Sequence, residues 1–282
     1  MSWLRRAYTA ITGDDGGTGA REVDDEAVRR LRAETAGRIA AGELNFRGAD
    51  LTGADLHGLA LAGADLREAT LRDADLSEAD LSGADLRDAN LCGAKLTRAV
   101  LAGARLDNAN CVRTGAHSPV DLSGAKLQGA SLVGAGLARS DLRGADLTGA
   151  VLLEAALGHA DLSGARLAHA NLNGAVLRHA RLDGAALAGA DLTTADLHRA
   201  RCRGVDLSGA SLRRANLSGA DLERANLHGA DLAEADLEGA KLGNADLGEA
   251  NLDRTEFDGA ELTGARLDGA DLSTAYNAPT GV

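Results

Sequence analysis

The side chains with the clearest chemical potential are histidines and arginines that recur at an interval of twenty residues. They are Arg139, His159, Arg178, His179, His198 and Arg199. Imidazoles titrate near neutral pH, and stacked imidazoles disfavour one another's protonation unless an anion lies over them. If residues twenty apart share one side of the folded chain, this basic/His face is a candidate site for an anion or an acidic partner. An ordinary solvated surface is the alternative.

Carboxylates are the second group that could do chemistry. The chain has 42 Asp and Glu against 30 Lys and Arg, which gives a formal net charge of −12 and argues against direct nucleic-acid binding. Acids strongly outnumber bases in residues 231–272. This acidic section supplies the candidate acidic interaction surface, which consists of Asp231, Glu234, Asp236, Glu238, Asp246, Glu249, Glu256 and Asp258. Most Asp residues repeat at one place in a five-residue period, so carboxylate pairs follow from periodicity and do not indicate acid–base catalysis.

Motifs of enzymes and metal sites are missing from the sequence. There is no serine–histidine–acid set, zinc-protease helix motif, P-loop or dinucleotide fingerprint. Cys92, Cys111 and Cys202 form neither a paired framework nor a C-x-x-C spacing. We therefore expect a non-enzymatic protein without a cofactor or metal. The cysteine usage and the absence of a secretory segment favour a cytoplasmic location, and no apolar run approaches the roughly 18 residues of a membrane span.

A period of five residues organises almost the whole chain. With position 3 as its centre, the repeat runs from Phe46 to Cys111 and from Leu122 to Leu272, and Leu fills 41 of 45 centres. Ala usually occupies position 1, Asp or Asn position 2 and Gly position 5. Five matches neither the helical period of 3.6 nor the strand period of 2. A solenoid accommodates it if each pentapeptide forms one side of a coil, with Leu and Ala inward and Gly at the corner.

The pattern A-[DN]-L-x-x resembles the pentapeptide repeat family over residues 45 to 275. The resemblance implies an all-β solenoid, a right-handed quadrilateral β-helix with four pentapeptides per coil. It also implies a class of partner, because some members bind DNA gyrase or topoisomerase IV as mimics of duplex DNA. This chain has fewer Phe centres than that subgroup, namely Phe46 and Phe257.

The ends of the solenoid need caps, because an open end exposes apolar core and unpaired backbone. Apolar residues on one face of the segment 24–42 predict a capping α-helix. The preceding tail contains Trp3 and is either folded back on the rod or disordered, or it is a tethered docking peptide. The predicted organisation is a flexible tail with a short amphipathic helix at 1–23, the cap at 24–42, the β-helix at 43–275 and a C-terminal tail at 276–282.

The repeat is interrupted at 113–120. Cys111 and Leu122 are eleven residues apart where ten would keep the phase, which predicts one extra residue, either a tolerated insertion or a functional loop. If the interruption preserves the order of the faces, Lys95, Arg98 and His117 lie on the same side as the basic/His face.

A further side carries outward apolar residues. Val112, Val133 and Leu153, with Val151 beside them, would form an apolar column. Such a column is either a partner contact or a set of tolerated residues.

Two functions remain open at this level. The first is a DNA-mimicking modulator or protector of gyrase or topoisomerase IV, and two rods joined as a homodimer at their C-terminal ends would present one long acidic tract. The second is a rigid protein–protein interaction scaffold that uses the acidic ends, the basic/His face and the apolar column. Neither requires nucleic acid, membrane or cofactor.

Overall fold

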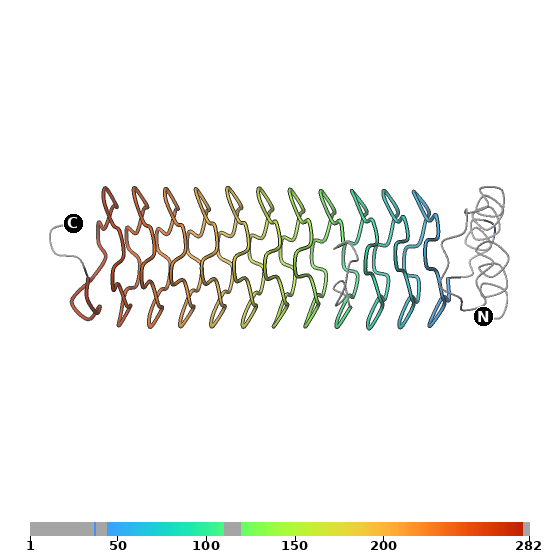
Figure 1. Cartoon of the computed structure of the whole chain (residues 1–282), viewed down its shortest axis with the longest axis horizontal. Coiled ribbons are helices and arrows are strands. Elements are labelled where there is room, and N and C mark those ends of the chain that lie inside the picture. The colour runs from blue at the N-terminus through green and yellow to red at the C-terminus, as the bar shows by residue number, and fades with distance from the viewer. Residues whose placement is uncertain (1–36, 38–43, 110–119, 279–282) are drawn as a thin grey trace, which may run out of the picture.

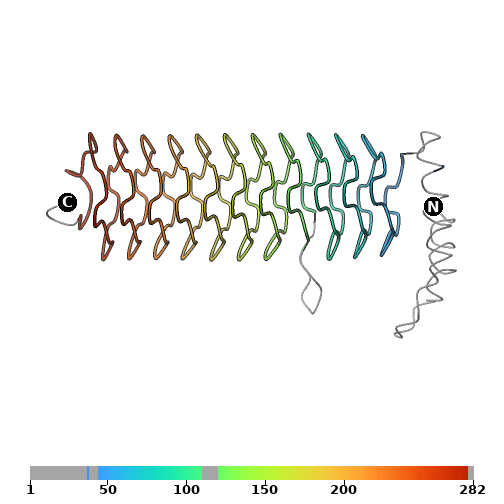
Figure 2. The ribbon, with the colours of Figure 1, turned by 90° about the horizontal axis from the view of Figure 1, so that it is seen from above.

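The chain forms a straight rod of stacked coils (Figures 1 and 2). The computed structural model describes Gly37 and residues 44–109 and 120–278. Successive coils pair in parallel through residues twenty apart, as in Asp65 with Asp85, Asp141 with Asp161 and Asp221 with Lys241. A spacing of twenty is four pentapeptides, so each coil has four sides, and residues ten apart lie on opposite sides.

The coils are held together by single-residue parallel bridges at position 2, and the described residues contain no longer strand. Leu66 N donates to the carbonyl of Asp85 at 2.8 Å, and Asp85 N donates to the carbonyl of Ala64 at 2.9 Å. The expected capping helix and N-terminal tail lie outside the described residues apart from Gly37, which is helical. Among the described residues no helix is long and apolar enough to cross a membrane.

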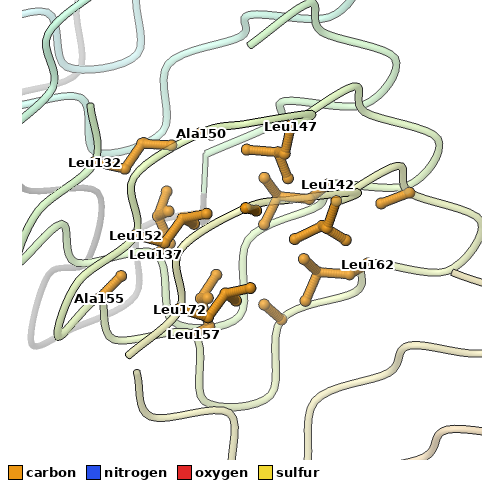
Figure 3. Packing of buried hydrophobic residues seen from close by; sticks show 14 of the residues in the cluster. Leu132, Leu137, Leu142, Leu147, Ala150, Leu152, Ala155, Leu157, Leu162 and Leu172 are labelled. Carbon is orange, nitrogen blue, oxygen red and sulfur yellow. The ribbon is translucent and has the colours of Figure 1, made fainter. Parts of the chain in front are cut away.

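The core is a continuous stack of Leu and Ala. Leu132, Leu152 and Leu172 belong to one side of three successive coils and lie above one another (Figure 3). These leucines have no exposed surface, and neither do most of the Ala residues at position 1. The exceptional centres Phe46, Cys202 and Phe257 are buried as well. Inward Leu and Ala with three outward positions is the arrangement that the five-residue period predicts.

Each corner is a tight turn with a left-handed residue at position 5. The Ala69 N–H donates to the carbonyl of Leu66 at 3.1 Å, which closes the turn over Arg67 and Glu68. At 43 described corners φ lies between +53° and +78°, and Gly supplies 24 of these positions while other residues supply 19. This conformation costs a residue with a Cβ about 1–2 kcal/mol. A corner without glycine is therefore less stable than the same corner with glycine.

The Asp or Asn at position 2 fixes the approach to the corner. Its side-chain oxygen accepts the backbone N–H two residues later, for example from Ser82 to Asp80 at 3.0 Å and from Asn173 to Asn171 at 3.0 Å. Arg67 adds two bonds to Asp65 at 2.8 and 2.6 Å, and this side-chain bonding lowers the pKa of Asp65 to about 2. These bonds hold the backbone in place where it enters the corner.

The interruption is longer than the sequence arithmetic suggests. Lys95 pairs with Asp121 and Arg105 with Ser131, a spacing of 26 residues (121 − 95) in place of twenty. The prediction of one extra residue is therefore wrong, since this coil holds six. The segment 110–119, which contains most of them, lies outside the described residues. The physical reason is that Leu96 N donates to the carbonyl of Asp121 at 2.7 Å, so the pentapeptide centred on Leu122 stacks directly on the one centred on Leu96.

The left-handed corner gives a first prediction. Gly144 has a φ of +63°, and an added Cβ would meet nothing within 4 Å. We expect Gly144→Ala to lower the free energy of unfolding by about 1 kcal/mol through backbone strain alone. Gly158 lies at position 4 without a positive φ, and its Cβ would make an ordinary 3.7 Å contact with the carbonyl of Arg178, so Gly158→Ala should be neutral or stabilising. Denaturant unfolding followed by circular dichroism measures both, and equal effects of the two substitutions would contradict this account.

The position 2 carboxylates give a second prediction. Because the folded-state pKa of Asp65 is about 2, against 3.8 for the free side chain, its ionised form stabilises the rod at neutral pH. This stabilisation is lost as the pH falls from about 4 towards 2. Asp65→Asn keeps the backbone acceptor but cannot titrate, so the variant should be less stable at pH 7 and lose less stability over that interval. Asp191→Asn is the control, because Asp191 accepts the N–H of Thr193 and has no ion pair with a described residue. A wild-type pH profile for Asp65→Asn would refute the assignment.

Candidate functional site: a face with opposite charges at its two ends

One side of the rod collects most of the residues singled out above, and we call it the histidine face. It comprises the pentapeptides centred on Leu137, Leu157, Leu177, Leu197, Leu217, Leu237 and Phe257. Bridges through position 2 connect them in an unbroken series from Gly136 to Tyr276, with intermediate steps such as Val176 to Asp196. The coils at Leu137 to Leu197 form its basic half, and those at Leu237 and Phe257 form its acidic half.

The basic half carries a ladder of three imidazoles. The rings of His159 and His179 are stacked with centroids 4.9 Å apart and an interplanar angle of 14°. The ring of His198 meets that of His179 edge-on at 6.0 Å, and its Nδ1 lies 2.8 Å from the hydroxyl oxygen of Ser218. Partial desolvation, together with His159, His198, Arg199 and Arg178, lowers the pKa of His179. Its neighbours therefore disfavour the protonated form of His179.

Three arginines surround this ladder. Arg139 and Arg199 occupy the position 5 corners next to His159 and His179, so all four side chains project from left-handed residues. Arg178 lies at position 4 and forms an ion pair with Asp196, which is the one carboxylate of the basic half. The structure thus brings together all six residues of the predicted basic/His face.

The predicted acidic surface is divided among three sides of the rod. Only half of its residues lie on the histidine face, namely Asp236, Glu238, Glu256 and Asp258. Glu238 and Glu256 are exposed, as is Asp258, whose carboxylate accepts a 2.9 Å bond from the amide of Asn277. None of the four forms an ion pair with another described residue.

The other four predicted acids are paired with cations. Asp231 lies 3.3 Å from Arg213, and Glu234 lies 2.8 Å from Arg214, which lowers the pKa of Glu234. Asp246 pairs with Arg266 at 3.2 Å, and Glu249 lies 3.8 Å from His228. Several of these cations belong to the coil before the acidic section, and counting charges along the sequence therefore missed them. Most acids of this section without an ion pair to a described residue therefore lie on the histidine face, while the exposed Asp253, Glu261 and Asp271 lie on other sides.

The register across the interruption corrects two predicted groupings. Lys95 and Arg98 do not lie on the histidine face, because Lys95 pairs with Asp121 and the Arg98 side chain lies 3.5 Å from the Cβ site of Gly124. His117 lies outside the described residues. The physical reason is that the interruption adds six residues and not one. Each side of the coils before it therefore stacks on a different side of the later coils than the sequence predicts.

The apolar column loses Val112 for the same reason. Asn108 N donates to the carbonyl of Val133 at 2.8 Å, so the residue below Val133 is Asp107 and not Val112. Val112 itself lies outside the described residues, while Val133, Val151 and Leu153 are half-buried on a neighbouring side. The two large apolar residues that are exposed in the described part, Val176 at 41% and Tyr276 at 52%, lie on the histidine face. Sequence reasoning missed them, although both occupy position 2 in the same twenty-residue series.

Besides these charges, metal ligands, nucleophiles and pockets in the described part of the rod could do chemistry. Within residues 44–109 and 120–278 no group of three His, Cys, Asp or Glu side chains is arranged to hold a metal ion. Burial raises the pKa of the Cys202 thiol, which disfavours its reactive form. A small depression lies between Arg203, Gly204, Glu223 and Arg224, but Arg203 is already paired with Asp221 and Glu223. The arrangement is suited to binding a charged surface.

Comparisons with known proteins agree with the coil geometry. The family model described as pentapeptide repeats matches in eight copies over residues 45–83, 84–114, 120–152, 160–199, 200–239 and 235–273. None of the curated proteins compared with this chain matches it.

Several solved structures are similar to this chain. HetL, a pentapeptide repeat protein involved in heterocyst differentiation regulation in the cyanobacterium Nostoc sp. strain PCC 7120, is 37% identical with a TM-score of 0.31 over 86% of this chain and 95% of its own. A pentapeptide repeat protein of the Arabidopsis thaliana thylakoid lumen is 33% identical with a TM-score of 0.27 over 37% of this chain and 59% of its own. The plasmid-mediated fluoroquinolone resistance protein QnrB1 is 18% identical with a TM-score of 0.27 over 83% of this chain and 90% of its own.

Pentapeptide repeat proteins fold as right-handed quadrilateral β-helices and are generally structural or interaction proteins. The repeat, the four-sided coils and the family match together show that this chain belongs to the pentapeptide repeat family.

Proposed function

We propose that this chain is a non-enzymatic binding protein whose acidic half mimics duplex DNA for a topoisomerase, either DNA gyrase or topoisomerase IV. The observation that carries the proposal is the strip of four carboxylates without ion pairs, which are Asp236, Glu238, Glu256 and Asp258. A surface of this kind attracts the cationic groove in which such an enzyme holds DNA, so the rod would modulate the enzyme or protect it from a drug or toxin.

The charge spacing supports this partner. Coils separated by about 4.8 Å place four carboxylates over two coils, or roughly one charge per 2.4 Å of rod. Duplex DNA carries about one charge per 1.7 Å. The strip therefore approaches the density of DNA over a short length, whereas the paired acids on the neighbouring sides add little. The proposal rests on these charges and not on the likeness to QnrB1, whose low identity indicates a shared fold alone.

A rigid interaction scaffold is the second candidate, and the histidine ladder favours it. Three imidazoles and three arginines within four coils form a cationic surface that DNA mimicry does not use. In this function the rod presents its basic half to an acidic protein and its half-buried column of Val133, Val151 and Leu153 to a further contact. Both candidates act without nucleic acid, cofactor or membrane, and a topoisomerase partner agrees with the cytoplasmic location expected from the cysteines.

A supercoiling assay with purified gyrase or topoisomerase IV tests the first candidate. We expect micromolar protein to inhibit the enzyme or to reduce its sensitivity to a quinolone, and we expect salt to weaken this effect because electrostatic attraction is screened. The double variant Glu238→Lys with Asp258→Lys should reduce the effect about tenfold or more, as two exposed charges are reversed at the contact.

The matched control reverses two acids on the opposite side of the same section. Glu249→Lys with Asp268→Lys changes the net charge equally, and both side chains are exposed, Asp268 at 82%. This variant should retain the activity of the wild type. Equal loss in both variants would indicate non-specific charge effects. No effect of the wild type at micromolar concentration would remove the topoisomerase proposal and leave the scaffold.

A further inference from the structure

On the histidine face, basic residues lie on one side of a single coil and acidic residues lie at matching positions on its other side. Along position 4 the series is Arg178, His198, Ser218, Glu238 and Asp258. Ser218 lies at the centre, with the guanidinium of Arg178 and the imidazole of His198 on one side and two carboxylates at equal distances on the other. Neither half of this pattern is required by the core, because these five side chains are exposed or half-buried.

We propose that the histidine face binds a second copy of this chain, with the two rods antiparallel and related by a two-fold axis through the coil of Ser218. Such an axis lies in the contact plane and is perpendicular to the rods. It reverses the order of the coils but leaves each outward column opposite itself. His198 of each rod then faces Glu238 of the other, and Arg178 faces Asp258. Each pair occurs twice, as in any two-fold contact.

The corners of this face are complementary in shape as well. At position 5 the bulky residues His179 and Arg199 stand on one side of the centre, and Gly239 and Gly259 stand on the other. The axis places Arg199 opposite Gly239 and His179 opposite Gly259. A Cβ at Gly239 would meet nothing within 4 Å. The long cationic side chains of one rod therefore enter open space next to the carboxylates of the other.

Position 2 completes the contact. Asn216 lies on the axis, and Val176, which is 41% exposed, lies opposite the aliphatic stem of Glu256. Asp196 faces Asp236, and this like-charge contact is offset because Asp196 already forms an ion pair with Arg178. The titratable and charged groups on this face are Arg139, His159, Arg178, His179, Asp196, His198, Arg199, Asp236, Glu238, Glu256, Asp258 and Tyr276.

The expected contact is small and electrostatic. Five coils of about 4.8 Å, those from Leu177 to Phe257, and a flat side about 10 Å wide cover roughly 240 Å² of each rod. A stable interface buries about 800 Å² per partner, so the dimer should form reversibly and depend on salt.

Sedimentation velocity of the full chain over a wide concentration range tests the proposal without any other protein. We expect concentration-dependent dimers in 0.01 M salt. In 1 M salt the association should be weaker by about tenfold or more, because the Debye length falls from about 30 Å to 3 Å. A rod that stays monomeric in low salt at every concentration would overturn the proposal and assign the face to a different acidic partner.

Charge-swap variants identify the interface. The basic-reversed variant, Arg178→Glu with Arg199→Glu, and the acid-reversed variant, Glu238→Lys with Asp258→Lys, should each lose self-association. Mixed in equal amounts, the two variants should form a heterodimer, because one face is then negative throughout and the other largely positive. The control pair Arg166→Glu with Asp268→Lys, on the opposite side, should dimerise like the wild type. Dimers that survive both face variants would place the contact elsewhere and refute the proposal, and circular dichroism verifies that each variant is folded. Because topoisomerase activity is not measured, this outcome is independent of the proposed function.

Discussion

The five-residue phase of buried Leu and Ala is the constraint on which the rest of the structure depends. Each pentapeptide contributes one large and one small apolar side chain to the interior, and only coils of four such units bring them into register. Close packing of Leu from one coil onto Leu of the next excludes water along the rod. Because the same two positions are buried in every unit, the other three are free to vary, and they carry all the chemistry of the protein.

The corners show how far this freedom extends. Backbone geometry asks for a left-handed residue at position 5, which Gly provides without strain. Arg139, His159, His179 and Arg199 occupy four successive corners of the histidine face, although their φ values of +53° to +64° disfavour a side chain. The pairing of neighbouring coils is strong enough to hold these residues in place. The strained backbone at these four corners places basic side chains in one continuous column.

Electrostatics follows from the coil geometry rather than from the net charge. A formal charge of −12 suggests an acidic rod, yet coil-to-coil pairs such as Arg213 with Asp231 and Arg214 with Glu234 neutralise much of the C-terminal section. What remains is a face that is cationic in one half and anionic in the other. A topoisomerase would use the acidic half of this face and an acidic protein the basic half. A second copy of the chain would use both halves and would therefore compete with either of the other partners.

The sequence by itself determines the solenoid, its buried positions, the bonding of the Asp and Asn side chains and the alignment of residues twenty apart, because all of these are consequences of a local period. It also predicts that His159 and His179 share a side, since no interruption separates them. The tertiary structure alone decides the register across 110–119, because the length of chain left out of a coil is set by which backbone groups pair and not by composition. That register separates Lys95 and Arg98 from the histidine face, and it places Asp107 below Val133. The structure alone also decides which carboxylates stay unpaired, because an ion pair depends on side chains one coil away, about twenty residues distant in the sequence.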